Sequence, residues 1–223
     1  MLGNNFAYRL RYSRGADVRY VSHLDILKLF DRACRRAELP VAYSEGFNPH
    51  PEFIFGMPLP VGVTSEAEYV DIKLHEKISN TDFIRRLNDA LPLAVRIIES
   101  KHLPENSSNI MKSVTASKYR VIVDFSASGL SIEDVYAKIA CELSANRPLV
   151  VMKRTKSGTR ETDIRPMIHS IECREYKDGF AEIIIVTAAG NLTNLRPELA
   201  INSICDVCAI EHKIVTIHRL ELI

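Results

Sequence analysis

Alternating apolar and polar positions open the chain, and a helical repeat follows them. From residue 6 to residue 12 every second side chain is aromatic or leucine, which is the period of a half-buried strand. Residues 23–39 then carry apolar side chains at helical spacing, and Pro40 is the expected stop. Ser22 is predicted to cap this helix, because Asp25 stands three residues later in the capping-box position.

The same two periods continue to about residue 100 and predict a complete unit. Residues 52–57, 68–74 and 93–97 have strand patterns, while Thr81 is predicted to cap a helix that extends to residue 91. The resulting order is β-α-β-β-α-β. This is the ferredoxin-like unit, with helices on one face of an antiparallel sheet.

The second half of the chain repeats this order with one extra strand. Residues 105–116 are polar and without period, and they are interpreted as a linker between domains 1–104 and 117–223. In the second domain we expect strands at 119–125, 148–153, 162–174, 180–188 and 213–222, and helices that begin after Ser131 and at Pro197. A basic hairpin tip, KRTKSGTR, lies between the second and third of these strands. The predicted fold is α+β with two tandem ferredoxin-like units; a single large α+β sheet is the alternative.

Composition and charge narrow the function only slightly. The 223 residues are 46% hydrophobic and 26% charged, as in ordinary globular proteins, and the net charge of +1 argues against a generally basic nucleic-acid coat. A local basic patch is still compatible with it. No apolar run approaches the roughly 18 residues of a membrane span, and the N-terminus lacks a signal-peptide core. The expectation is a cytoplasmic protein without a membrane partner.

Most sequence signatures of cofactor chemistry are missing. There is no G-x-G, so neither a dinucleotide fingerprint nor a P-loop is present, and no G-x-S-x-G or C-x-x-x-C-x-x-C occurs. Cys205 and Cys208 have C-x-x-C spacing, but only three residues separate them from His212, too few for a zinc finger. No cofactor and no metal are expected, although a metal at this pair is left open. The five cysteines are expected to be reduced.

Two histidines and two basic clusters are the candidate chemistry. His23 begins the first helix and His50 lies between prolines; the helix would hold them roughly 20 Å apart, hence in different sites. Phosphate contacts are predicted for Lys28, Arg32, Arg35 and Arg36 on the helix and for Lys153, Arg154, Lys156 and Arg160 at the hairpin tip. Arg9, Arg11 and Arg19 add charge beside Tyr8, Tyr12 and Tyr20, whose rings could stack with RNA bases. The alternative is that these are ordinary solvated charges.

Residues 20–72 resemble the opening of the radical SAM-linked proteins, a bacterial domain family. The shared motifs are S-H-L-D (22–25), R-A-x-R-R-A-x-L-P (32–40), Y-S-x-G-F-N-P-H-P (43–51) and S-x-x-E-Y (65–69), with D-I-R-P (163–166) later. Members are fused to, or encoded beside, a radical SAM protein with a cobalamin-binding-like region. The sequence has no cluster motif of its own, which fits the stand-alone form of the family, whose catalytic partner is a separate polypeptide.

A weaker similarity connects the same stretch to the RAMP-type proteins, which include CRISPR repeat-processing endoribonucleases. Those are tandem ferredoxin-like RNA binders, often with a catalytic histidine in the first half, a place that His23 would fill. Their C-terminal glycine-rich loop is missing here, since Gly190 is the last glycine.

Three functions follow as hypotheses. The first is a non-catalytic accessory subunit that presents a substrate, RNA above all, to a radical SAM enzyme. The second is a metal-independent endoribonuclease that uses His23 as general base, and the third is a protein-interaction module without nucleic acid. Substrate or partner binding is expected at His23, Asp25, Arg32, Arg35, Arg36, Tyr43, Ser44, Gly46, Phe47, Asn48, His50, Lys153, Arg154, Lys156, Asp163 and Arg165.

Overall fold

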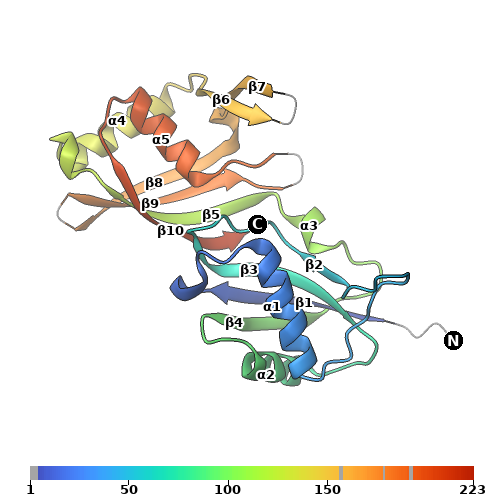
Figure 1. The fold of residues 1–223 in the computed structure, drawn as a ribbon. Helices are drawn as coiled ribbons and strands as arrows, with labels where there is room; N and C mark the ends of the chain where they lie inside the picture. The colour runs from blue at the N-terminus through green and yellow to red at the C-terminus, as the bar shows by residue number, and fades with distance from the viewer. Residues whose placement is uncertain (1–4, 156–157, 178, 191–192) are drawn as a thin grey trace. The chain divides into compact units, whose positions relative to one another are not determined.

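The computed structural model describes residues 5–155, 158–177, 179–190 and 193–223. The chain divides into two units, Met1–Val114 with Leu222 and Thr115–Glu221 with Ile223. The predicted α+β class is confirmed, and each unit has a ferredoxin-like strand order (Figure 1).

The first unit has the predicted β-α-β-β-α-β order, followed by a short helix. Its elements are β1 (Phe6–Arg14), α1 (His23–Arg36), β2 (Phe53–Phe55), β3 (Thr64–Leu74), α2 (Asn80–Ala90), β4 (Val95–His102) and α3 (Ile110–Ser113), with a 3-10 turn at Ala16–Val18. β1 pairs antiparallel with both β3 and β4, and β2 pairs with β3, which gives the order β4-β1-β3-β2. The segment expected to be a linker, 105–116, contains α3 and the first residue of β5.

The core of this unit follows directly from the alternation in β1. Tyr8, Leu10 and Tyr12 point to one face and are buried there against α1 and α2. The prediction that the rings of Tyr8 and Tyr12 stack with RNA bases is therefore wrong. Tyr8 meets Phe83 of α2 edge-to-face at 5.2 Å, and Tyr12 meets Phe30 of α1 at 4.9 Å. Aromatic pairs in this geometry add to the stabilisation from burial.

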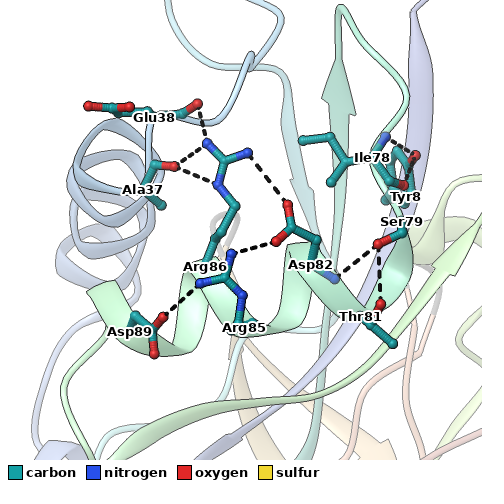
Figure 2. Close-up of polar contacts among 10 residues, drawn as sticks. All are labelled: Tyr8, Ala37, Glu38, Ile78, Ser79, Thr81, Asp82, Arg85, Arg86 and Asp89. Carbon is teal, nitrogen blue, oxygen red and sulfur yellow. Dashed lines mark hydrogen bonds and ion pairs between the residues drawn. The ribbon is translucent and has the colours of Figure 1, made fainter.

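The C-terminal end of α1 and the N-terminal end of α2 differ from the sequence prediction. α1 ends at Arg36 rather than residue 39, because Glu38 adopts a left-handed conformation with φ of 50° and turns the chain out of the helix. The prediction that Thr81 caps α2 is wrong. Ser79 is the cap, and its hydroxyl accepts a hydrogen bond from the Asp82 backbone N–H at 3.2 Å (Figure 2).

The second unit has one strand more than predicted. Its elements are β5 (Ala116–Asp124), α4 (Ile132–Ser144), β6 (Val150–Thr155), β7 (Gly158–Asp163), β8 (Ile168–Lys177), β9 (Phe180–Ala188), α5 (Pro197–Val207) and β10 (Lys213–Leu222). The strand order is β10-β5-β9-β8, while β6 and β7 form a separate two-stranded ribbon. The expected strand 162–174 is two strands, because a 3-10 turn at Arg165–Met167 interrupts it and Pro166 has no N–H to donate to a ladder.

Candidate functional site

The start of α1 brings His23 to a partly exposed position. The predicted capping box is present: Ser22 accepts from the Asp25 backbone N–H at 3.2 Å, and its hydroxyl donates to the Asp25 carboxylate at 2.7 Å. The hydroxyl's hydrogen bond lowers the pKa of Asp25. This cap fixes the first turn of α1 and with it the place of the His23 ring.

The His23 ring is half-buried on an aromatic surface. It packs edge-on against Phe55 of β2 at 5.4 Å, with the two rings at 90°. Burial lowers the pKa of His23 from 6.5, the nearby Arg14 charge lowers it further, and the Glu68 carboxylate opposes both. At neutral pH the imidazole is therefore uncharged and keeps one nitrogen free of a proton. A ring in this state can accept a hydrogen bond or take up a proton.

Arg14 and Glu68 are two buried charged residues near His23 that the sequence did not mark as site residues. Arg14 is 2% exposed and donates to the Val18 and Val21 carbonyls at 3.1 and 2.8 Å, which holds the segment that leads into α1. Glu68 is 3% exposed and is the glutamate of the S-x-x-E-Y motif. That motif was the available signal for Glu68, whereas Arg14 lies outside all the quoted motifs. The structure thus brings the glutamate of the S-x-x-E-Y motif near His23 of the S-H-L-D motif.

The loop 43–51 is closed at its base by Ser44 and His50. The Ser44 backbone N–H donates to the His50 carbonyl at 2.9 Å, and the His50 N–H donates to the Ser44 hydroxyl at 3.1 Å. The same hydroxyl lies 2.8 Å from the His50 ring Nδ1, and Tyr43 and Pro51 form an isolated β-bridge behind the pair. Gly46 adopts φ of 121°, which favours glycine over other residues.

Phe47 stands at the far end of this closed loop. Its exposed fraction is 111%, and Asn48 and Pro49 beside it are also exposed. An aromatic side chain fully in water, on a loop whose base is hydrogen-bonded shut, has no role in packing its own chain.

The loop base is anchored to the middle of α1. The Tyr43 hydroxyl donates to Asp31 at 3.3 Å, and the Arg35 guanidinium lies 5.8 Å from the Tyr43 ring while it pairs with Asp31 at 3.0 Å. Asp31 is eight residues after His23, or about 12 Å along a helix. The loop therefore folds back toward α1, and the assignment of His23 and His50 to different sites stays a prediction.

Much of the predicted basic surface on α1 is occupied by contacts within the first unit. Lys28 lies 3.6 Å from the Asp25 carboxylate, Arg35 pairs with Asp31, and Arg36 donates to the Ala90 carbonyl at 2.7 Å. Arg32 is exposed.

Three of the predicted site residues of the second unit, Lys153, Asp163 and Arg165, form hydrogen bonds to backbone groups of their own unit. Asp163 accepts from the Leu149 and Arg165 backbone N–H groups, both at 2.9 Å, and Arg165 donates to the Leu143 carbonyl near the end of α4 at 2.6 Å. Lys153 donates to the Asn194 carbonyl at 3.2 Å. Arg160 is exposed, whereas Lys156 and the side chain of Arg154 lie outside the described residues.

Two adjoining cavities lie on the first unit, away from His23. They measure about 440 and 400 Å³ and share five lining residues, among them Ala7, Lys73 and Ser107. Volumes of this order are common for ligand pockets. One wall is fixed by Arg9, which binds Asp71 at 2.7 Å and the Ser108 carbonyl at 2.8 Å. No site residue predicted from the sequence lines either cavity.

Comparison with known protein families identifies the family of the chain. A family model described as "uncharacterized protein conserved in bacteria" (DUF2344) matches residues 7–197. The chain belongs to this family. A search of curated proteins found no match.

Solved structures resemble the chain only distantly. A Cbf5-Nop10-Gar1 complex matches with a TM-score of 0.49 at 12% identity, over 96% of this chain and 47% of the other. The archaeal box H/ACA sRNP Nop10-Cbf5 complex gives 0.47 at 11% identity, over 96% and 46%. A putative glycine cleavage system transcriptional repressor gives 0.24 at 9% identity, over 96% and 98%. The chain thus spans about half the length of the first two chains.

Neither a membrane-spanning helix nor a metal-binding group of side chains occurs among the described residues. None of their helices is long and apolar enough to cross a membrane. No three or more of their His, Cys, Asp or Glu side chains are grouped so as to hold a metal ion. In the C-terminal set, His212 lies 2.9 Å from the Asn202 side-chain oxygen and 3.2 Å from the Ile210 carbonyl.

Proposed function

We propose that this protein is a non-catalytic accessory subunit that docks onto a separate radical SAM enzyme through its loop 43–51. The observation that carries the proposal is Phe47, fully exposed at the end of a loop that Ser44 and His50 close. The motifs shared with radical SAM-linked proteins support the choice of partner.

The loop has the physical properties of a docking element. Its base is ordered by the Ser44–His50 hydrogen bonds and by the contact of Tyr43 with Asp31, so little conformational entropy is lost on binding. A buried aromatic side chain at the centre of an interface commonly contributes a large share of the affinity. Phe47 is placed to enter an apolar pocket of a partner, with the loop backbone around it available for hydrogen bonds.

Co-purification from cells that express the protein naturally tests this role. The tagged native chain should recover a radical SAM polypeptide in near-stoichiometric amount, as identified by mass spectrometry. Phe47→Ser should lose it. Leu93→Ser is the matched control, because Leu93 is 82% exposed in the same unit and lies outside the loop. The proposal is wrong if no radical SAM polypeptide is enriched, or if Phe47→Ser recovers it as well as the control does.

Contact with RNA is a second candidate, favoured by Arg19 and Tyr20. The Arg19 guanidinium lies over the Tyr20 ring at 4.8 Å, and Tyr20 is 69% exposed. A base can stack on such a ring while the guanidinium attracts the phosphate backbone. Arg32 on α1 is a further exposed cation. On this reading the subunit presents RNA to the enzyme.

Binding of single-stranded RNA at several salt concentrations tests the second candidate. Phosphate contacts predict an affinity that falls steeply with salt, and Tyr20→Ala should weaken binding at every salt concentration. The absence of binding at low salt would argue against contact with RNA, and salt-independent binding would argue against the phosphate contacts. The same samples report cleavage: loss of RNA cutting in His23→Ala with binding retained would favour the endoribonuclease hypothesis instead.

A further inference from the structure

Two cysteines stand on neighbouring helices of the second unit, one within α4 and one as the C-cap of α5. Cys141 is exposed on α4, and Cys208 is the partly exposed residue that ends α5. The Cys208 Sγ lies 3.7 Å from the backbone oxygen of Lys138, one helical turn before Cys141. Figure 1 shows α4 and α5 as neighbours in this unit, and the two helices are in contact.

Residues of α4 also act on the pKa of Cys208. Partial burial raises the pKa of Cys208 most, followed by Glu142, and the Cys141 thiol raises it further. The cations Lys138 and Arg147 act in the opposite direction. The Cys208 Sγ thus lies against the helical turn that leads to Cys141, on a helix that packs against α5.

The other three cysteines have a different environment. Burial raises the pKa of Cys34, Cys173 and Cys205 to about 12 in each case. At neutral pH they remain thiols, and the thiolate is the nucleophile in disulfide exchange. Any exchange chemistry is therefore directed to the more accessible pair.

We propose that Cys141 and Cys208 are an oxidisable pair that forms a disulfide between α4 and the end of α5. The oxidant is a small disulfide of the glutathione class. The Cys141 thiolate attacks one sulfur of that disulfide and releases one small thiol. The Cys208 thiolate then attacks the Cys141 sulfur of the mixed disulfide and releases the second. Two protein thiols become one disulfide while one small disulfide is reduced to two thiols, and both protein protons pass to the solvent and the released thiolates.

The bond would stabilise the second unit. It joins residues far apart in the sequence, and closing such a loop reduces the freedom of the unfolded chain. Because the pKa of Cys208 is raised, the second step should become faster as pH increases. This proposal does not depend on the role of the loop 43–51.

The test is treatment of the folded, reduced protein with oxidised glutathione at mildly alkaline pH, followed by peptide mapping. The expected result is a peptide pair linked through Cys141 and Cys208, a mass loss of two hydrogens, and a melting temperature higher by about 5 °C or more that a reductant reverses. Cys208→Ser should stop at a glutathione adduct on Cys141, and Cys173→Ser should behave like the native protein. A native protein that yields only the adduct, or links through Cys34, Cys173 or Cys205, would overturn the proposal.

Discussion

Arg36 and Arg86 each bind the C-terminal end of the helix that carries the other. Arg36, the last residue of α1, donates to the Ala90 carbonyl at the end of α2 at 2.7 Å. Arg86 of α2 donates to the Ala37 carbonyl at 2.9 and 2.5 Å and to the Glu38 carbonyl at 2.5 Å, just beyond α1 (Figure 2). A guanidinium placed there satisfies carbonyls that the helix leaves without donors and complements the helix dipole. Arg36 thus has a structural task in the first unit.

Arg86→Met should lower the free energy of unfolding by about 1–2 kcal/mol, because three charge-assisted hydrogen bonds to helix-end carbonyls are lost. Urea titration measures the change. Arg85→Met is the matched control: Arg85 is the neighbouring residue, but its partners are the surface carboxylates of Asp82 and Asp89 (Figure 2). The control should leave unfolding nearly unchanged. Equal effects of the two variants would contradict the helix-end role of Arg86.

Asn88→Ala should destabilise the first unit by about 1–2 kcal/mol and promote aggregation. The Asn88 amide donates to the Ile97 carbonyl at 3.0 Å and accepts from the Ile97 N–H at 2.8 Å, so it covers backbone groups of β4. β4 is the outer strand in the order β4-β1-β3-β2. Urea titration and light scattering provide the measurements. Asn88→Asp keeps only the acceptor, so its free energy of unfolding should lie between those of Asn88→Ala and the native protein. An Asp variant as unstable as the Ala variant would contradict this role of Asn88.

His23 should titrate below 6.5, and its titration should reduce stability in acid. Its pKa is lowered in the folded state, so the unfolded chain binds the proton more tightly and stability falls as pH drops through the unfolded value near 6.5. NMR of the imidazole gives the pKa directly. His23→Gln should flatten the change in unfolding free energy between about pH 7.5 and pH 5, whereas His169→Gln, at an exposed position, serves as control. A His23 pKa at or above 6.5 would rule this out.

Ser44→Ala should weaken binding of the partner enzyme several-fold with little effect on unfolding. The hydroxyl accepts from the His50 N–H and contacts the His50 ring, but the loop it closes is on the surface. Its loss would let the loop sample other conformations, which lowers affinity. The co-purification assay, repeated with purified components, measures the effect. Native affinity in Ser44→Ala would mean that Phe47 acts without an ordered loop.

The sequence by itself determined the order of elements in the first unit and, except for the division of strand 162–174, in the second, because local periodicity carries that information. The alternation in β1 and the helical repeat of α1 specify which side chains enter the core, and Tyr8 and Phe30 are buried as their positions predict. The capping box at Ser22 and Asp25 was equally readable, since both partners lie within one turn. The start of α2 was harder to predict from the sequence: Thr81 lies near it, but Ser79 is the residue whose side chain caps the helix.

Only the tertiary structure decided which polar residues serve the fold and which are available to a partner. Arg36 and Arg165 looked like binding residues, yet the carbonyls they bind are 54 and 22 residues away, and no local pattern encodes such distances. Arg14 and Glu68 come together at His23 because strands distant in sequence pair with a fixed register. The sequence marked Phe47 as a binding residue; that it remains exposed at the end of loop 43–51 depends on the packing of the first unit.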